Sequence, residues 1–285
     1  PDQTKYYFDK SISLGINRLA INDIQNGHQP LVNEKKNVIV VYNGEIYNSK
    51  KLRQILIKNK IRLKSNSDGE VIPHLYDLYG KNVFNYLDGM FSIALWDKQK
   101  KKLFLARDSA GEKPLYYYSN REQFSFSSEI KALRKLKGFS NNLNYQAIWD
   151  LPTFLWVPEP NTIFSNIKSL NPGTVLEVEN NIIKKYKIKC NFLNDYSLLK
   201  NENDFIEETQ KVVRESITSR LMSDVKVGSF LSGGLDSSIV ATIASEYLNK
   251  IDTYTIGFPK IKDPYGGFND ESFEALATSK KIASN

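Results

Sequence analysis

The sequence predicts two domains of different fold class: an α+β domain built on antiparallel sheets, followed by the start of an α/β domain with a parallel sheet. The length of 285 residues sets a prior of about two globular domains. Short apolar runs, each bounded by turn or charged residues, fill residues 12–135. From residue 205 onward, helical and strand patterns alternate, which is typical of a parallel sheet.

The first domain is predicted to be a sandwich of antiparallel strands covered by helices. Its strand-like apolar runs are residues 38–42, 91–96 and 102–106. Residues 50–60 and 68–79 instead carry apolar side chains at helical spacing. Ser67 or Asp68 is the expected N-cap of the second helix.

A connector is predicted to follow the first domain. A helix expected at 145–156 leads into Pro158 and Pro160, which cannot continue it. A small strand-turn-strand unit is expected around Pro172 and Gly173.

The second domain is predicted from a single succession of elements. These are a helix at 205–221, a strand at 226–231, a helix at 237–248 and a strand at 252–258. Because two strands cannot make a parallel sheet with both faces buried, we expect the sequence to be truncated here. The predicted division is 1–150 for the first domain, 151–204 for the connector and 205–285 for the start of the second domain.

The composition excludes several classes of protein. With 1 Cys and 2 His, the chain alone cannot build an internal disulfide or an ordinary Cys/His zinc site. No apolar run approaches the roughly 20 residues that span a bilayer, and residues 1–5 lack a signal pattern. The 39 Lys and Arg residues exceed the 32 Asp and Glu residues but are dispersed, so we expect neither a nucleic acid nor a membrane as partner. The single cysteine fits a reducing cytoplasm.

The strongest chemical signal is a Gly-rich loop between the strand predicted at 226–231 and the helix after it. The loop consists of Ser232, Gly233, Gly234, Leu235, Asp236, Ser237 and Ser238. Paired glycines expose backbone N–H groups, the helix adds its positive end, and hydroxyls donate to phosphate oxygens. No Lys follows the glycines, so pyrophosphate is a better ligand than the γ-phosphate of a Walker-type ATPase. A capped Gly-rich turn without a ligand is the alternative.

The segment RLMSDVKVGSFLSGGLDSS at 220–238 resembles the pyrophosphate loop of N-type ATP pyrophosphatases and, with its flanks, the glutamine-hydrolysing asparagine synthetases. That resemblance implies an adenine nucleotide alpha hydrolase-like domain that binds ATP, with Mg²⁺ organised by Asp236. The implied pyrophosphate contacts are Ser232, Gly233, Gly234, Asp236, Ser237 and Ser238. Leu231 and Ile256 would flank the nucleotide at the ends of adjacent predicted strands, where an open parallel sheet leaves a ligand crevice.

The resemblance to the same family extends over the first half of the chain. The motifs that carry it are LGINRLAINDIQNGHQP, VYNGEIYN, SDGEVI, LDGMFSIALWD, LFLARDSAGEKPLYY and FSSEIKAL, in the family's order. They imply an αββα sandwich like that of the Ntn hydrolases and a glutamine amidotransferase domain. In this family, ATP adenylates the β-carboxylate of aspartate, and ammonia from glutamine attacks to give asparagine, AMP and pyrophosphate.

By this analogy, Arg18 pairs with the carboxylate of glutamine and Asp68 binds its ammonium. The Asn43 side-chain amide and the Gly44 N–H form the oxyanion hole, and Glu45 assists substrate placement. One cation, acidic groups and preorganised N–H donors are what glutamine hydrolysis requires. We expect Arg107-Asp108 and Glu112-Lys113-Pro114 to support the fold or its interface, and we assign no chemistry to them. The resemblance leaves open a homodimer.

The family's nucleophile, an N-terminal Cys, is absent from this sequence. Pro1-Asp2 resembles the end of the family's Arg-Gly-Pro-Asp segment, so we expect truncation upstream as well, and an inactive fragment. Cys190, the only cysteine, is far in sequence from the glutamine motifs and is expected to be an ordinary residue. Phe268-Asn269-Asp270-Glu271-Ser272 resembles the family's acidic helix start.

Three alternative functions stay open at this point. The chain could come from a related amidotransferase or ligase with another carboxylate acceptor, because the acceptor pocket would lie beyond Asn285. An ammonia-dependent form without glutaminase activity fits the missing cysteine. A non-enzymatic nucleotide-binding or scaffold protein fits it too, but the complete phosphate loop argues against this class.

Overall fold

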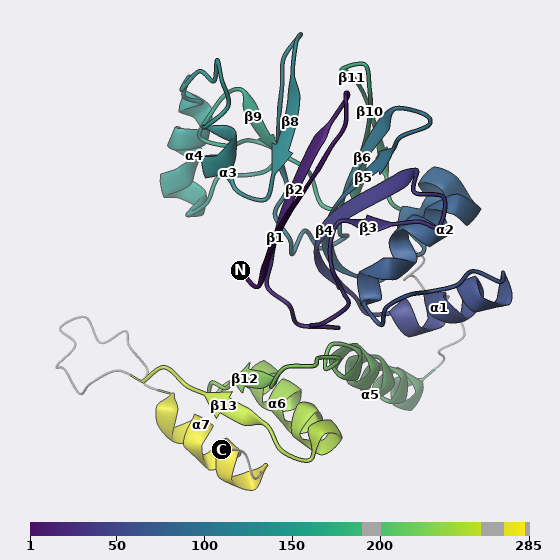
Figure 1. Cartoon of the computed structure of the whole chain (residues 1–285). Coiled ribbons are helices and arrows are strands. Elements are labelled where there is room, and N and C mark those ends of the chain that lie inside the picture. Colours follow the sequence, from purple (N-terminus) through teal and green to yellow (C-terminus); the bar gives the residue numbers. More distant parts are fainter. Residues whose placement is uncertain (190–200, 258–270, 283–285) are drawn as a thin grey trace. The chain divides into compact units, whose positions relative to one another are not determined.

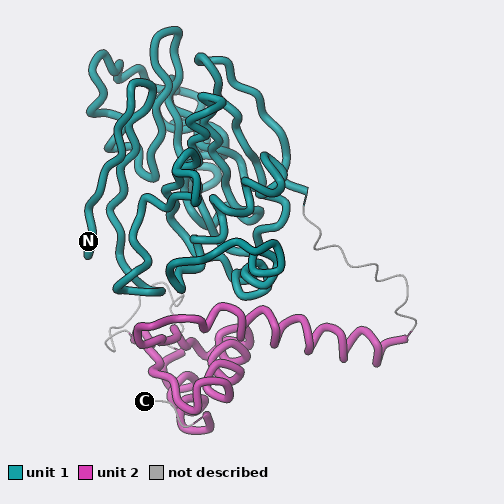
Figure 2. Tube along the Cα trace, turned by 45° about the vertical axis from the view of Figure 1, so that its right-hand side comes forward, with its two compact units in different colours: residues 1–194 teal, residues 195–285 magenta. Residues whose placement is uncertain are grey.

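The computed structural model of the chain describes residues 1–189, 201–257 and 271–282 (Figure 1). The chain divides into two compact units, Pro1–Asn194 and Asp195–Asn285 (Figure 2). Each unit has its own core, so we treat each by itself.

Unit 1 is built mainly of antiparallel strands. In chain order its elements are β1 (Gln3–Phe8), β2 (Ser13–Arg18), β3 (Leu31–Val32), β4 (Val38–Ile46), α1 (Ser49–Lys58), the 3-10 helix η1 (Asp68–Glu70), α2 (Val71–Tyr79), η2 (Gly80–Asn85), β5 (Gly89–Asp97), β6 (Lys102–Arg107), β7 (Tyr116–Ser119), β8 (Phe124–Ser127), α3 (Ile130–Leu133), α4 (Tyr145–Phe154), β9 (Ile167–Ser169), β10 (Thr174–Glu179) and β11 (Ile182–Lys187). The central sheet has the order β11-β10-β6-β5-β4-β3.

Alternation along the central strands supplies both faces of this sheet with core residues. In β4, Val38 and Val40 belong to the cluster that α1 and α2 cover, whereas Ile39 and Val41 belong to the cluster on the opposite face. Successive side chains of a strand point to opposite faces, so one apolar run serves two cores. This explains why β4 to β6 have continuous apolar sequences and not alternating ones.

A second β layer covers the other face of the central sheet. It consists of the β1–β2 hairpin and a sheet of order β8-β7-β9. Leu14 of β2 packs there with Trp96 and Leu105, and the indole Nε1 of Trp96 donates to Asp9 Oδ2 over 2.9 Å. Helix α3 packs on β7 and β8, so the layers run helix, sheet, sheet, helix (Figure 1). The predicted αββα sandwich is confirmed.

Residues predicted as a connector add strands to both β layers of unit 1. β10 pairs with β6 from Thr174↔Arg107 to Val178↔Leu103, and β9 pairs with β7. The partner of each of these two strands lies far earlier in the chain, and no local sequence pattern reveals such a pairing.

Unit 2 begins an α/β arrangement. Its elements are α5 (Glu202–Ser219), β12 (Gly228–Phe230), α6 (Leu235–Leu248), β13 (Asp252–Tyr254) and α7 (Ser272–Lys281). β12 and β13 pair in parallel, from Gly228↔Asp252 to Phe230↔Tyr254. The predicted parallel start of an α/β domain is confirmed. Helix α5 begins three residues earlier than predicted, because the Asn201 side chain caps it by accepting from the Asp204 N–H at 3.0 Å.

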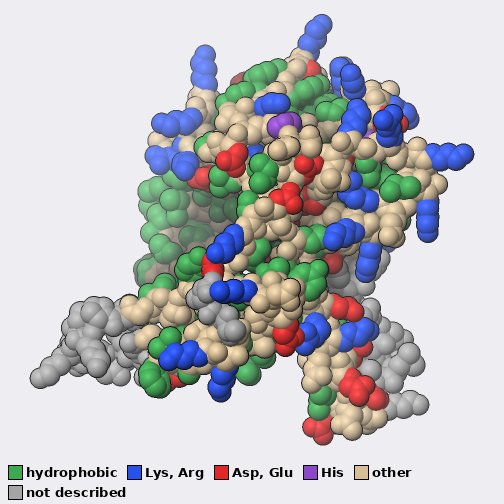
Figure 3. All heavy atoms as spheres, turned by 60° about the horizontal axis from the view of Figure 1, so that its bottom comes forward, with side chains coloured by type: hydrophobic (Ala, Val, Ile, Leu, Met, Phe, Trp, Pro, Cys, Tyr) green, Lys and Arg blue, Asp and Glu red, His purple; other side chains and the backbone are tan. Residues whose placement is uncertain are grey.

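Surface charge is distributed without a strongly basic face in the view of Figure 3, where Lys and Arg side chains lie scattered among acidic and apolar ones. Within the described residues, no helix has the length and apolar character to cross a membrane.

Candidate functional site

A cavity of about 1100 Å³ lies between the two β layers of unit 1. All five residues that the sequence singled out for glutamine binding line it: Arg18, Asn43, Gly44, Glu45 and Asp68. They come from the end of β2, the end of β4 and the start of η1. The fold therefore brings together three segments that are well separated in the sequence.

Gly44 occupies a position that only glycine fills. Its φ of +146° lies where L-residues are strained, and an added Cβ would stand 1.9 Å from the Met90 carbonyl oxygen of β5. Asn43-Gly44 is therefore not the tight turn that the dipeptide alone suggests, but part of β4 pressed against β5. The close approach fixes the backbone beside the exposed Asn43 side chain.

Asp68 is held by two hydrogen bonds in the wall of the cavity. Its Oδ1 accepts from the Tyr42 hydroxyl at 2.8 Å, and its Oδ2 accepts from the Ile46 N–H at 2.6 Å. Burial raises the pKa of Asp68, although both of these donors act against the rise. The sequence predicted that Ser67 or Asp68 caps the following helix, and this prediction is wrong. Neither side chain makes a cap hydrogen bond at the start of η1 or of α2.

Arg18 is oriented by the loop that follows β2. Its Nη2 donates to the Asn22 carbonyl at 2.6 Å and to the Asp23 carbonyl at 3.2 Å. A Cβ on Gly27 would lie 2.7 Å from the same Nη2, so the guanidinium fits against a glycine of this loop. Among the described residues, the Nε and Nη1 donors of Arg18 find no hydrogen-bond acceptor.

Glu45 shares the cavity with charges of both signs. Burial raises the pKa of Glu45, the neighbouring Asp68 charge raises it further, and Lys113 opposes the rise. Burial and the Asp68 charge also raise the pKa of Tyr42. Two acidic groups, Glu45 and Asp68, and two cations, Arg18 and Lys113, thus line the same cavity.

Two contributors to this site were missed from the sequence. The Tyr42 hydroxyl donates a hydrogen bond to Asp68. The side-chain amide of Gln29 in turn holds the Tyr42 backbone: it donates to the Tyr42 carbonyl at 2.9 Å and accepts from the Tyr42 N–H at 2.8 Å. Tyr42 lies next to Asn43 in the VYNGEIYN motif, so its neighbourhood was visible. Its role was not, since it depends on a contact across 26 positions.

The Gly-rich loop of unit 2 joins β12 to α6, as expected from the sequence. The Ser237 hydroxyl lies 2.8 Å from the Ser232 hydroxyl and accepts from the Ser232 N–H at 3.1 Å. The Ser232 hydroxyl in turn accepts from the Gly234 N–H at 3.1 Å. The loop is thus closed on itself by its own serines.

The third loop donor binds an acidic side chain. The Gly233 N–H donates to Glu271 Oε2 at 3.2 Å, and a Cβ on Gly233 would lie 2.8 Å from the Glu274 Cβ. Glu271 thus places a carboxylate where the loop N–H groups would meet an anion. The sequence marked Glu271 only as part of an acidic helix start, of which residues 268–270 lie outside the described residues.

Asp236 projects from the first turn of α6 and is exposed. Mg²⁺ is commonly held by one or two carboxylates together with substrate phosphates, and an exposed carboxylate next to the loop fits that chemistry. No group of three or more potential metal ligands occurs in the part of the chain that the structure describes.

Leu231 and Ile256 follow the carboxyl ends of the paired strands β12 and β13. The Leu231 side chain is buried with Ala241 and Ala275, so only its backbone faces the loop. Ile256 is exposed. Cys190 lies outside the described residues.

Comparison with known proteins gives the two units separate relationships. Residues 1–188 match the glutamine amidotransferase domain family, and residues 208–285 match the asparagine synthase family. Asparagine synthetase [glutamine-hydrolyzing] 1 of Bacillus subtilis is 34% identical over 260 residues, covering 90% of this chain and 40% of the relative. A second B. subtilis asparagine synthetase is 36% identical over 271 residues, covering 90% of this chain and 35% of the relative.

The chain therefore spans about two fifths of the length of these relatives. A solved glutamine phosphoribosylpyrophosphate amidotransferase from B. subtilis superimposes with a TM-score of 0.43 at 18% identity, covering 91% of this chain and 57% of that one. That score is too low to add to what the layers of unit 1 already establish.

Proposed function

We propose that this chain, which belongs to the glutamine amidotransferase family, comes from an enzyme that makes asparagine from aspartate with ammonia taken from glutamine. Unit 1 would release the ammonia, and unit 2 would begin the domain in which ATP activates the aspartate β-carboxylate. The proposal for unit 1 is supported by the convergence of Arg18, the Asn43-Gly44-Glu45 stretch and Asp68 on one cavity. The proposal for unit 2 is supported by the phosphate loop and by the match to the asparagine synthase family.

In the glutamine site, the free donors of Arg18 would bind the α-carboxylate, and Asp68 would receive the α-ammonium. The Asn43 amide and the Gly44 N–H would stabilise the oxyanion of the tetrahedral intermediate. Removal of one such donor costs about 3–4 kcal/mol of transition-state stabilisation. The nucleophilic cysteine that the family resemblance implies is not among these residues, so we assign them binding and charge stabilisation only.

In the nucleotide site, the N–H groups and hydroxyls of Ser232, Gly233, Gly234, Ser237 and Ser238 would bind the pyrophosphate part of ATP. Asp236 would hold Mg²⁺, which supplies charge neutralisation for the leaving pyrophosphate when bound. Leu231 and Ile256 would flank the nucleotide. A cytoplasmic location and a homodimer are further parts of this proposal, the latter testable by sedimentation of the full-length protein.

A comparison of two nitrogen sources tests the glutamine site. Arg18→Lys in the full-length enzyme should lower product formation from glutamine and leave formation from ammonium chloride close to wild type, because the two half-reactions use different sites. Equal loss with both nitrogen sources would contradict the assignment.

Pyrophosphate release tests the loop. Ser232→Ala or Asp236→Asn should abolish aspartate-dependent pyrophosphate release while glutamine hydrolysis persists. The reason is that the loop stabilises charge that grows on the leaving group. Release that is retained in both variants would show that the loop does not hold the pyrophosphate, and release driven by a carboxylate other than aspartate would identify another acceptor.

A further inference from the structure

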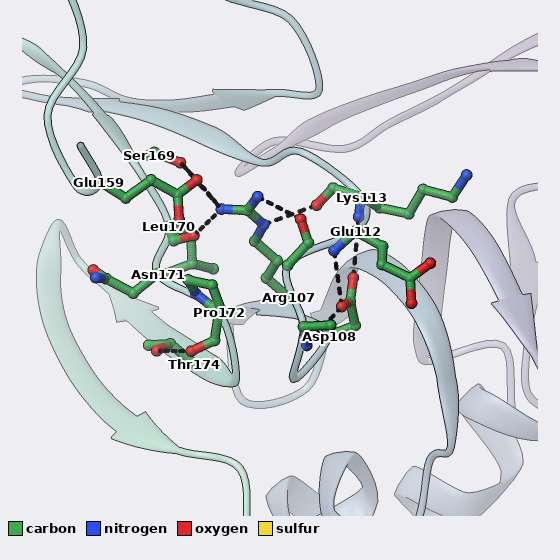
Figure 4. A network of polar contacts seen from close by, with 12 residues as sticks. Arg107, Asp108, Glu112, Lys113, Glu159, Ser169, Leu170, Asn171, Pro172 and Thr174 are labelled. Carbon is green, nitrogen blue, oxygen red and sulfur yellow. Dashed lines mark hydrogen bonds and ion pairs between the residues drawn. The ribbon is translucent and has the colours of Figure 1, made fainter. Parts of the chain in front are cut away.

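The polar network at the end of β6 is organised around Arg107 (Figure 4). This side chain is buried and donates in two directions. Its Nε donates to the Lys113 carbonyl at 2.9 Å and its Nη2 to the Gly111 carbonyl at 2.6 Å. Its Nη1 bonds Glu159 Oε1 at 2.6 Å and the Leu170 carbonyl at 2.7 Å. Arg107 thus ties the loop after β6 to residues on both sides of β9, Glu159 before it and Leu170 directly after it.

Asp108 holds the same loop through its N–H groups. Its Oδ1 accepts from Ala110 at 3.1 Å and from Glu112 at 3.0 Å, and its Oδ2 accepts from Lys113 at 3.1 Å. With the Arg107 bond to its carbonyl, Lys113 has both backbone groups fixed by side chains of this pair. The sequence predicted that Arg107-Asp108 and Glu112-Lys113-Pro114 support the fold or its interface, and these contacts show what Arg107 and Asp108 hold in place.

The side chain of Lys113 leaves this network. Figure 4 shows it extending away from Arg107 and Asp108. It lines the cavity that also holds Glu45 and Asp68, and its charge acts on Glu45. Within residues 1–189, 201–257 and 271–282, the ammonium makes no hydrogen bond or ion pair. Lys113 therefore has a backbone fixed by hydrogen bonds and a charged side chain that lines the proposed glutamine site.

The charges around Glu45 explain why a cation is needed there. Asp68 from η1 repels Glu45, and two neighbouring carboxylates in a partly buried site cannot both stay ionised without compensation. Arg18 from β2 is committed to the loop carbonyls and, as proposed above, to the ligand carboxylate. Lys131, which also lines the cavity, pairs with Glu129. Lys113 is the cation whose position leaves it to balance Glu45.

We propose that Lys113 is a positioning residue of the glutamine site: with its backbone held by Arg107 and Asp108, its ammonium offsets the like charges of Glu45 and Asp68, which together receive the α-ammonium of the substrate. This role rests on the function proposed above. It makes the loop after β6 part of the site, although Lys113 acts on glutamine through Glu45.

The pH dependence of glutamine hydrolysis by the full-length enzyme tests this role. Lys113→Gln removes the charge and should move the acid limb of kcat/KM for glutamine to higher pH, so that kcat/KM on the acid side of the limb falls below that of the wild type. Lys113→Arg should restore the wild-type profile. Lys131→Gln is the matched control, since it removes a cavity-lining lysine that pairs elsewhere, and it should leave the limb in place.

Arg107→Lys tests the anchor, because Lys keeps the charge but not the fork of donors. It should shift the limb in the same direction, and the double variant with Lys113→Gln should behave as Lys113→Gln alone. An acid limb that is unchanged in Lys113→Gln, or one that Lys131→Gln moves equally, would overturn the proposal. A wild-type enzyme that hydrolyses no glutamine would instead refute the proposed function, so the two failures are distinguishable.

Discussion

Replacement of Asp68 separates its role in the fold from its role in binding. The carboxylate accepts from the Tyr42 hydroxyl and the Ile46 N–H, both of which are buried. Asp68→Ala leaves two buried donors unsatisfied at about 1–3 kcal/mol each, so we expect a loss of about 2–6 kcal/mol in the free energy of unfolding.

Asp68→Asn should cost far less. The amide oxygen can accept from Ile46, and the amide nitrogen can donate to the Tyr42 hydroxyl, which rotates to accept. Both hydrogen bonds then survive, and we expect a change of roughly 1 kcal/mol or less. The charge that would meet the glutamine ammonium is lost, however. A hydrogen bond to a charged group contributes about 1.5–3 kcal/mol, so kcat/KM for glutamine should fall roughly 10- to 150-fold.

Asp97 offers a matched control. It is also buried, accepts from the Tyr76 hydroxyl at 2.9 Å and accepts from backbone N–H groups, yet it does not line the cavity. Urea unfolding and steady-state kinetics with glutamine and with ammonia should show similar stabilities for Asp68→Asn and Asp97→Asn, with a kinetic defect only in the first. Normal glutamine kinetics in Asp68→Asn, or an equal defect with ammonia, would refute the binding role.

Three further predictions concern other residues of the two sites. Gly44→Ala should lower the free energy of unfolding by several kcal/mol, because its Cβ would meet the backbone of β5, whereas Gly80→Ala, at a positive φ with open space around it, should cost only the backbone strain of about 1–3 kcal/mol; a loss in Gly44→Ala no larger than that in Gly80→Ala in urea unfolding would contradict the close approach. Because burial raises the pKa of folded Glu45, the stability it contributes is complete below its unfolded value of about 4.3 and is lost as pH rises through the folded value. The free energy of unfolding of the wild type, relative to that of Glu45→Gln, should therefore decrease as the pH is raised above about 4. An increase with pH would show that folding lowers the pKa of Glu45 and does not raise it. Glu271→Gln should tighten pyrophosphate binding in calorimetry, because in the wild type the Glu271 carboxylate accepts the Gly233 N–H that pyrophosphate would use. Unchanged or weaker binding would show that Glu271 does not compete with pyrophosphate for the loop.

The sequence predicted those parts of the fold that local patterns encode. The apolar runs of β4, β5 and β6 identified the central strands because each face of that sheet is buried. It did not predict β1, whose residues Gln3–Phe8 are mostly exposed, nor the pairing of β10 with β6. An exposed strand has few apolar residues, so its sequence pattern is weak. Pairing between strands that are distant in the chain produces no local sequence pattern at all.

For the candidate site, motif resemblance identified residues but not their contacts. It named Asp68 without the Tyr42 and Ile46 donors that hold it, and it interpreted the same residue as a cap. It gave Arg107 a supporting role without showing that Lys113 is what the network positions. Such roles arise where a loop and a strand meet in space, which residue types at a given spacing do not encode.

The fate of the glutamine amide nitrogen tests the central claim most directly. The full-length enzyme would be incubated with amide-labelled ¹⁵N-glutamine, aspartate, ATP and Mg²⁺, and all products would be quantified. We predict ¹⁵N-asparagine, glutamate, AMP and pyrophosphate in equal amounts. ADP and phosphate in place of AMP and pyrophosphate, or asparagine without ¹⁵N, would contradict the account.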